Sequence, residues 1–121
     1  ILGAKRDPGF GPVVMIGSGG ILVELLRDVQ LALAPIDPAE AEALLRGVKA
    51  WPLLEGYRGR GRLDIPAVAS ALSRLSRLAV DLGSRLGEID VNPLIVRTDG
   101  RGVVAADARA VIAPETQDQD P

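Results

Sequence analysis

The sequence predicts a mixed α+β domain in which helices pack against a largely antiparallel sheet. Three observations carry this prediction: apolar runs of strand length, helical segments with recognisable N-caps, and two C-terminal strands that follow each other around a tight turn. The chain has 121 residues, 47% of them hydrophobic, with 14 basic against 16 acidic side chains. This composition is that of a folded globular domain rather than a disordered chain.

The first third of the chain predicts strands separated by glycine-rich breaks. Residues 1–5 have the pattern of the end of a strand, and residues 12–16 form a continuous apolar run between glycines, typical of a buried strand. The loop 17–20 ends that strand, and a short helix is expected over residues 21–27. Residues 29–34 begin with apolar and polar side chains in alternation, so we expect another strand there.

Two further helices have N-terminal signals. Asp37 can cap a helix that has a proline in its first turn and Glu40 at capping-box spacing. Asp64 can cap a longer helix over residues 65–82, whose apolar side chains recur at helical spacing. Between these helices, residues 51–62 are rich in glycine and arginine and are expected to form a loop.

The last two strands supply the geometry of the candidate site. Residues 88–97 and 102–112 are expected to be strands joined at the dipeptide 99–100, an Asp-Gly pair typical of a two-residue hairpin turn. With this pair at the centre of the turn, residues that face each other have numbers that add up to 199. Asn92 therefore lies directly opposite Asp107.

The facing pair has the chemistry of a magnesium site. Asp90 shares the face of Asn92, because strand side chains repeat every second residue. Two carboxylates and one amide oxygen on one patch suit one or two Mg²⁺ ions, whose other positions hold water or phosphate oxygens. The alternative is an ordinary solvated sheet face, with Asp90 paired to Arg109.

The residues that the chain lacks exclude several kinds of chemistry. Without histidine or cysteine it cannot form a Ser-His-Asp triad, a cysteine nucleophile, a disulfide, or a zinc or haem site of the usual kind. Any bound metal must be a hard cation held by oxygen. A net charge of −2 gives no footprint for nucleic acid or an anionic membrane. No apolar run approaches the length of a membrane span, and we expect a reducing, cytoplasmic compartment.

Glycine-rich segments outside the hairpin are candidate anion sites. One lies between a strand and the expected short helix, and its backbone N–H groups could cradle a phosphate: Gly17, Ser18, Gly19 and Gly20. A tight turn with close packing is the alternative there. The loop 56–62 carries Arg58 and two more arginines among glycines, which suits phosphate or carboxylate, and its alternative is a solvated basic loop. Glu24 and Asp28 are expected to be surface charges.

These segments together resemble a known family. The stretches that carry the resemblance are residues 10–21, 28–29, 52–59, 88–94 and 107–109. In this order and at this spacing they resemble the ATP-grasp domain of ADP-forming (NDP-forming) acyl-CoA synthetases, which are related to succinyl-CoA synthetase β subunits. The resemblance implies that residues 1–113 are the C-terminal part of an ATP-grasp domain, cut from a longer chain. A polar, disordered tail is expected over residues 114–121.

The resemblance also implies an activity and a set of site residues. Members of that family convert a carboxylic acid, CoA and ATP into acyl-CoA, ADP and phosphate, through an acyl phosphate and a phosphohistidine. ATP and Mg²⁺ are the implied cofactors. The resemblance assigns the metal ligands to Asn92 and Asp107, with Asp90 near the phosphoryl-transfer centre. It places Arg58 and the loop 17–20 in the same cleft.

The missing histidine implies partners. The N-terminal half of the ATP-grasp domain and the CoA-binding and CoA-ligase domains, with their phosphohistidine, are expected elsewhere in a homo- or hetero-oligomer, so the chain alone should not turn over. The substrates are expected to be CoA and a small carboxylic acid, and neither nucleic acid nor a membrane is expected as a partner. Two alternatives remain: a regulatory nucleotide-binding module fused to an acetyltransferase, and an interaction domain that pairs through its first apolar strand.

Overall fold

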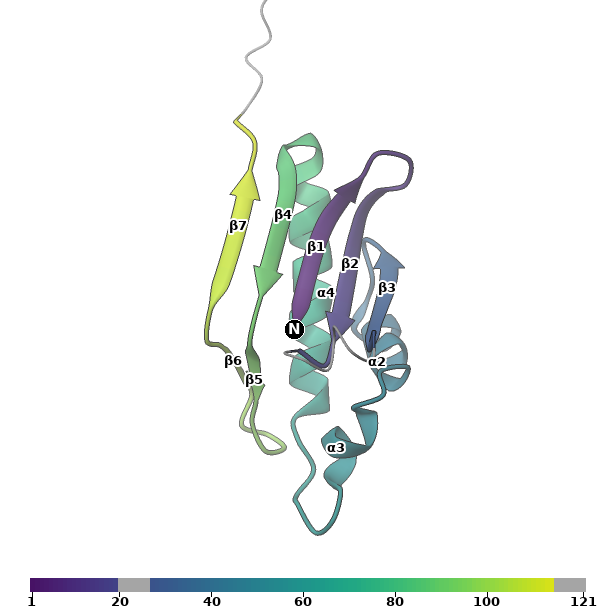
Figure 1. The fold of residues 1–121 in the computed structure, drawn as a ribbon, viewed down its shortest axis with the longest axis vertical. Coiled ribbons are helices and arrows are strands. Elements are labelled where there is room, and N and C mark those ends of the chain that lie inside the picture. Colours follow the sequence, from purple (N-terminus) through teal and green to yellow (C-terminus); the bar gives the residue numbers. More distant parts are fainter. Residues whose placement is uncertain (20–26, 115–121) are drawn as a thin grey trace, which may run out of the picture.

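A five-stranded antiparallel sheet, in the order β3-β2-β1-β4-β7, organises the chain (Figure 1). Its strands are β1 (Leu2–Asp7), β2 (Gly11–Gly17), β3 (Val29–Leu33), β4 (Leu86–Val91) and β7 (Ala108–Ile112). The computed structural model describes residues 1–19 and 27–114. Gly20, Glu24, nearly all of the expected short helix and residues 115–121 of the expected tail therefore lie outside the described residues.

Helices complete the fold and confirm the predicted α+β class. They are α2 (Pro38–Arg46), α3 (Trp51–Gly56) and α4 (Ile65–Leu82), and a short 3-10 turn, η1 (Gly83–Arg85), follows α4. Two short strands, β5 (Leu94–Val96) and β6 (Val103–Ala105), pair with each other in a sheet of their own. Among the described residues, no helix has the length and apolar character needed to cross a membrane.

The helices cover only one face of the large sheet. In Figure 1, α4 runs behind β1, β2 and β4 along their length. The core between them is built from alternate strand residues and the inner side of the helix, including Leu2, Val14, Ile16, Ile89, Val68, Leu72 and Ala79. No helix of the described residues covers the other face, which we call the open face.

The open face corrects one expectation about β2. Its continuous apolar run predicted a buried strand, but only Val14 and Ile16 are buried, while Val13 and Met15 on the open face are partly exposed. The interaction-domain alternative also fails as stated. The strand β2 pairs with β1 on one side and β3 on the other, so its edges are already occupied.

The capping residues place two helices where the sequence predicts them. The Asp37 carboxylate accepts a hydrogen bond from the Glu40 N–H at 2.7 Å at the start of α2. The Asp64 carboxylate accepts one from the Ala67 N–H at 3.2 Å at the start of α4, whose bounds match the prediction. Each carboxylate satisfies a backbone donor that the first turn of a helix leaves unpaired.

The expected loop 51–62 is wrong over its first half, because residues 51–56 form α3. The cause lies far away in the sequence. Both oxygens of the Asp28 carboxylate accept backbone hydrogen bonds ahead of α3, one from Lys49 and one from Ala50 at 3.2 Å. Asp28 was expected to be a surface charge, and that expectation is also wrong: the residue is only 4% exposed. We call this contact the Asp28 clamp.

Candidate nucleotide and magnesium site

The C-terminal hairpin has the predicted register. Asp90 faces Arg109 and Val91 faces Ala108 in the β4–β7 pair, and Leu94 faces Ala105 in the β5–β6 pair. All three pairs obey the rule that facing residue numbers add up to 199. The prediction that follows from the Asp-Gly turn is therefore confirmed along the hairpin.

The hairpin differs from the prediction in one respect, since it is not one continuous ladder. It breaks at Pro93, which has no N–H to donate to a neighbouring strand. Two backbone bonds bridge the break: Asn92 N–H to the Asp107 carbonyl and Ala106 N–H to the Pro93 carbonyl, both 3.0 Å. Asn92 and Asp107 therefore face each other at the junction of the two sheets, where both residues are exposed.

The side-chain oxygens at this junction have no partner among the described residues. Within residues 1–19 and 27–114, the side chains of Asp90, Asn92 and Asp107 form no hydrogen bond or ion pair. Arg109 faces Asp90, yet no ion pair joins them. The alternative in which Asp90 is neutralised by Arg109 is therefore not the arrangement found.

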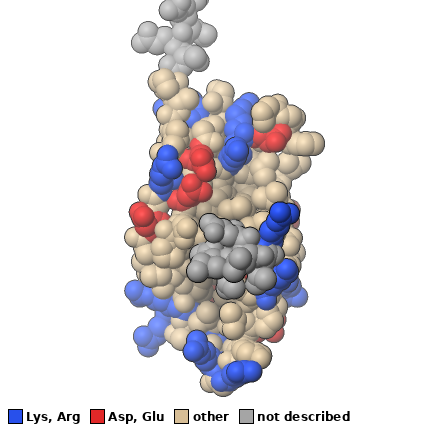
Figure 2. All heavy atoms as spheres, viewed as in Figure 1, with Lys and Arg blue, Asp and Glu red and all other residues tan. Residues whose placement is uncertain are grey.

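Asp90 lies on the open face of the sheet. A Cβ built on Gly3 of β1 would lie 3.2 Å from the Met15 Cε and 3.8 Å from the Asp90 Oδ1, so a larger residue at Gly3 would crowd this part of the face. Figure 2 looks onto this face and shows acidic and basic side chains next to each other over β4 and its neighbouring strands. The strand register pairs Lys5 with Glu88 and Asp90 with Arg109.

The side-chain oxygens of the facing pair fit a magnesium ion that takes most of its ligands from other molecules. A carboxylate and an amide oxygen in register suit a hard cation. The described residues contain no group of three or more acidic side chains able to hold a metal by themselves. Waters and phosphate oxygens would therefore fill the other coordination positions, as is usual for Mg²⁺ bound with a nucleotide.

The Gly17 loop has less capacity for an anion than its composition indicates. The Gly17 N–H donates to the Ile1 carbonyl at 3.0 Å, and the Ser18 N–H donates to the Asp28 carbonyl at 3.2 Å. A Cβ on Gly17 would lie 2.9 Å from the Val29 Cγ1, so this glycine is required for close packing. Of the four loop residues, Gly19 keeps a backbone N–H with no partner among the described residues, and Gly20 lies outside them.

Arg58 lies in the loop after α3, where several residues have a positive φ. Its backbone has φ 53°, and its guanidinium carbon lies 5.2 Å from the centre of the Tyr57 ring. The side chain is exposed, and no hydrogen bond or ion pair joins it to Asp90 or Asp107. The structure does not bring Arg58 into contact with the facing pair.

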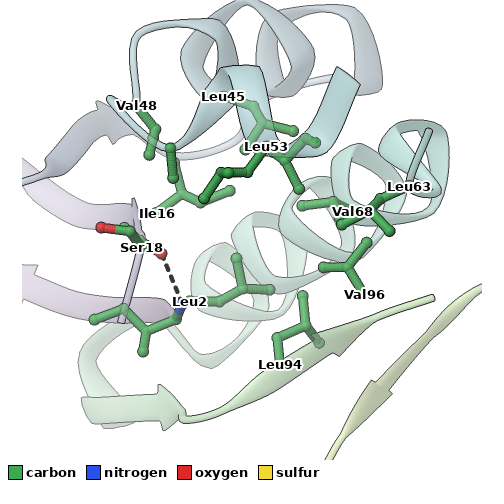
Figure 3. A pocket seen from close by; sticks show the side chains of 14 residues that line it. Leu2, Ile16, Ser18, Leu45, Val48, Leu53, Leu63, Val68, Leu94 and Val96 are labelled. Atoms are coloured by element: carbon green, nitrogen blue, oxygen red, sulfur yellow. Dashed lines mark hydrogen bonds between the residues drawn. The ribbon is translucent and has the colours of Figure 1, made fainter. Parts of the chain in front are cut away.

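An apolar hollow lies behind the junction (Figure 3). It has a volume of about 280 Å³ between the ends of β1 and β2, helices α2 and α3, and the hairpin. In Figure 3, Leu94 and Val96 point from β5 toward Val68 at the start of α4. The hairpin is therefore packed on the main core through these side chains.

Two residues at the edge of the site have structural roles that the sequence alone does not indicate. One is Asp28, which holds the start of α3 and accepts from Ser18 in the Gly17 loop. The other is Asp64, which was expected only as a helix cap. Its second carboxylate oxygen accepts a hydrogen bond from the Gly102 N–H of the hairpin at 2.7 Å. No local pattern reveals the contact of Asp28 with Lys49 or that of Asp64 with Gly102, because each of these two partners is more than 20 residues away.

With this geometry described, comparison with known proteins defines the class. Residues 1–112 match the profile of the ATP-grasp domain. The chain therefore belongs to the ATP-grasp domain family, and the resemblance inferred from the sequence is confirmed.

The similar proteins are ADP-forming CoA ligases. The chain is 40% identical over 112 residues to acetate–CoA ligase [ADP-forming] II subunit beta of Pyrococcus furiosus, covering 93% of this chain and 48% of that protein. It is 42% identical to 4-hydroxybutyrate–CoA ligase [ADP-forming] of Nitrosopumilus maritimus, covering 90% of this chain and 16% of that protein. The chain thus spans about half, or less, of these relatives.

A solved structure shares the fold. It is the dinucleotide-forming acetyl-coenzyme A synthetase 1 of Candidatus Korarchaeum cryptofilum, in complex with coenzyme A and Mg-AMPPCP. The TM-score is 0.84 at 42% identity, and the match covers 92% of this chain and 51% of that one. The same complex has a phosphohistidine segment that points towards its nucleotide-binding site.

Proposed function

We propose that this chain is the part of an ADP-forming acid–CoA ligase that binds ATP and Mg²⁺ and positions the phosphoryl group for transfer. The reaction of the whole enzyme is a carboxylic acid, CoA and ATP giving acyl-CoA, ADP and phosphate. One observation carries the proposal: Asn92 and Asp107 face each other in register with unengaged oxygens at the edge of an open sheet face. Relatives of the chain are ADP-forming CoA ligases, and one binds Mg-AMPPCP.

Each site residue has a role that its chemistry supports. When bound, Mg²⁺ neutralises phosphate charge and stabilises the charge that develops during phosphoryl transfer. The Asn92 amide oxygen and the Asp107 carboxylate would hold that ion, and Asp90 would extend the acidic patch along β4. Arg58 offers a guanidinium that can bind two phosphate oxygens at once. In the Gly17 loop, the N–H of Gly19 is the described amide best placed to bind a phosphate oxygen.

The rest of the reaction requires partners. We infer that residues 1–113 are the C-terminal part of an ATP-grasp domain whose N-terminal half supplies further contacts to the nucleotide. The chain has no histidine, so a phosphohistidine must come from CoA-ligase domains elsewhere, on the same polypeptide or on a second subunit. Two relatives are β subunits, and this chain covers only 16% of another, which is compatible with either arrangement.

The test is ADP release by the intact enzyme with ATP, Mg²⁺, CoA and a panel of carboxylic acids. We expect Asp107→Ala to lower kcat/KM by about 10²–10³-fold, the usual loss when one group that stabilises transition-state charge is removed. Asp81→Ala is the matched control, because it removes an equally exposed carboxylate on α4, away from the site. Acid- and CoA-dependent ADP formation that is lost only in Asp107→Ala supports the proposal.

Two other results would contradict it. Unchanged turnover in Asp107→Ala would remove the metal assignment. Nucleotide binding without any ADP formation in the unmodified enzyme would instead favour the regulatory module.

A further inference from the structure

We propose that Asp64 is a positioning residue for the nucleotide and magnesium site. It ties the β5–β6 hairpin to the start of α4, and through the hairpin it holds the Asn92–Asp107 pair in place. This inference rests on the proposed function, because it concerns the geometry of that same pair.

The contacts of Asp64 reach both strands of the hairpin. Its Oδ1 accepts from the Ala67 N–H at 3.2 Å in α4, and its Oδ2 accepts from the Gly102 N–H at 2.7 Å. Its own N–H donates to the Arg97 carbonyl at 2.8 Å. Arg97 directly follows β5 and Gly102 directly precedes β6, so one buried residue, 7% exposed, holds both strands near the turn.

The residues before Asp64 strengthen this attachment. The Asp99 N–H at the hairpin turn donates to the Arg62 carbonyl at 2.9 Å, and Leu63 forms an isolated β-bridge with Thr98. Residues 62–64 thus run along the end of the hairpin like a short third strand. This end of the hairpin is fixed by backbone bonds, whereas its other end is the interrupted junction at Pro93.

The attachment of the hairpin to Asp64 matters for Asn92 and Asp107 because the strand pairing breaks next to them, at Pro93. Asn92 and Asp107 are joined to the hairpin through Pro93 and Ala106, and only two backbone bonds cross that junction. Four residues, which include the whole of β5, separate Asn92 from Arg97. The direction in which the hairpin leaves the large sheet therefore depends on its packing through Leu94 and Val96 and on the anchor at Asp64.

A carboxylate is needed at this position for both contacts. An aspartate offers two acceptor oxygens, which here serve Ala67 and Gly102. An asparagine offers one oxygen and a donor NH₂ group, and asparagine and aspartate are equally good N-caps. The substitution Asp64→Asn can therefore keep the cap of α4, but its NH₂ group would then face the Gly102 N–H, donor against donor.

The experiment uses the intact enzyme and compares Asp64→Asn with Asp37→Asn. Asp37 caps α2 with one oxygen, at 2.7 Å from the Glu40 N, and has no contact with the hairpin. We expect Asp64→Asn to raise the Mg²⁺ concentration for half-maximal ADP formation by about 10-fold, the lower end of the loss when a direct hydrogen-bond partner of a metal ligand is removed, because Asp64 acts on the pair through the hairpin. Asp37→Asn should stay within about 2-fold of the unmodified enzyme, because asparagine preserves its single cap.

A second variant guards against a folding defect. Asp64→Ser keeps one acceptor for the Ala67 N–H without placing a donor amide against Gly102. It should show the same increase in Mg²⁺ requirement with a smaller thermal loss than Asp64→Asn, because no donor amide then faces the Gly102 N–H. A thermal loss in both Asp64 variants with no change in the Mg²⁺ requirement would show a purely structural role and overturn the inference.

The control Asp107→Ala separates the two claims. If Asp107→Ala leaves the Mg²⁺ requirement unchanged, the proposed function fails. If Asp107→Ala changes it and Asp64→Asn behaves like Asp37→Asn, the proposed function stands and the positioning role of Asp64 is wrong.

Discussion

Replacing Asp28 with alanine would remove the Asp28 clamp and test whether a distant carboxylate holds α3. The carboxylate is 4% exposed and accepts backbone hydrogen bonds from Lys49 and Ala50, directly ahead of the helix. Alanine leaves both N–H groups without that acceptor. We expect α3 to lose its fixed start, whereas the backbone carbonyl of residue 28 still accepts the Ser18 N–H and should keep the Gly17 loop in place.

The expected loss of stability follows from the two hydrogen bonds that the Asp28 carboxylate accepts. A hydrogen bond to a charged group contributes about 1.5–3 kcal/mol, but water can partly replace the carboxylate at Lys49, whose residue is exposed. The free energy of unfolding should therefore fall by about 2–4 kcal/mol in Asp28→Ala. Asp28→Asn keeps one acceptor oxygen and should lose about half as much.

Trp51 offers a local assay. It is the only tryptophan, it opens α3, and the guanidinium carbon of Arg46 lies 5.5 Å from the centre of its ring. Urea unfolding of the chain can be monitored in two ways. Tryptophan fluorescence reports on the surroundings of α3, and far-ultraviolet circular dichroism reports on the whole fold. In Asp28→Ala the fluorescence transition should come at lower urea than the dichroism transition. A loss below about 0.5 kcal/mol, with coincident transitions, would refute the clamp, since surface substitutions cost no more than this.

The pH dependence provides an independent check. Burial alone would raise the pKa of Asp28, but the hydrogen bonds that its carboxylate accepts, above all from the Lys49 backbone, together with the Lys49 charge outweigh it and lower the pKa below its ordinary value of 3.8. A lowered pKa stabilises the fold at pH values above 3.8, and this contribution is lost as the pH falls below 3.8 through the folded pKa. The difference in stability between the unmodified chain and Asp28→Ala should therefore shrink below pH 3.8. A difference that stays constant to pH 2 would contradict the assignment.

Two further substitutions, each with a matched control, test the packing of the sheet. Leu72 lies on the inner side of α4 and is 0% exposed, so Leu72→Ala should lower the free energy of unfolding in urea by about 2–5 kcal/mol. Leu78 is 46% exposed on the same helix, and Leu78→Ala should lower it by less than about 1 kcal/mol. Gly87→Ala would place a Cβ 2.6 Å from the Val111 carbonyl oxygen, so we expect a loss of about 1–3 kcal/mol and faster amide exchange in β7. Gly61→Ala, where a Cβ would meet nothing within 4 Å, should leave both measurements unchanged, and equal effects at the two glycines would rule out the steric cause.

The parts of the fold that sequence predicts well are those fixed by local chemistry. The turn at Asp99-Gly100 sets the hairpin register, and this is enough to bring Asn92 opposite Asp107. Asp64 and the periodic apolar residues after it likewise give the bounds of α4. In both cases the determining residues are neighbours in the chain.

The parts that sequence misses depend on contacts between distant segments. α3 has few helical signals of its own, and its start is held by Asp28 from another part of the chain. The partial exposure of β2 depends on which elements cover the sheet, which the apolar run cannot indicate. The role of Asp64 in the hairpin needs Gly102, whose amide is brought to it only by the finished fold.

The irregularity of β4 at Gly87 has a consequence for how this strand tolerates changes in length. The pairing shifts between Leu86 and Glu88, so Gly87 is an extra residue opposite β7. Deleting it would leave Leu86 and Ile89 facing the helices and Glu88 and Asp90 facing outward, because regular alternation would then hold. A one-residue insertion after Ile89 would instead turn Asp90 into the core and reverse every residue up to Asn92. A change in strand length at Gly87 therefore preserves the site. The same change two residues later, after Ile89, would disrupt it.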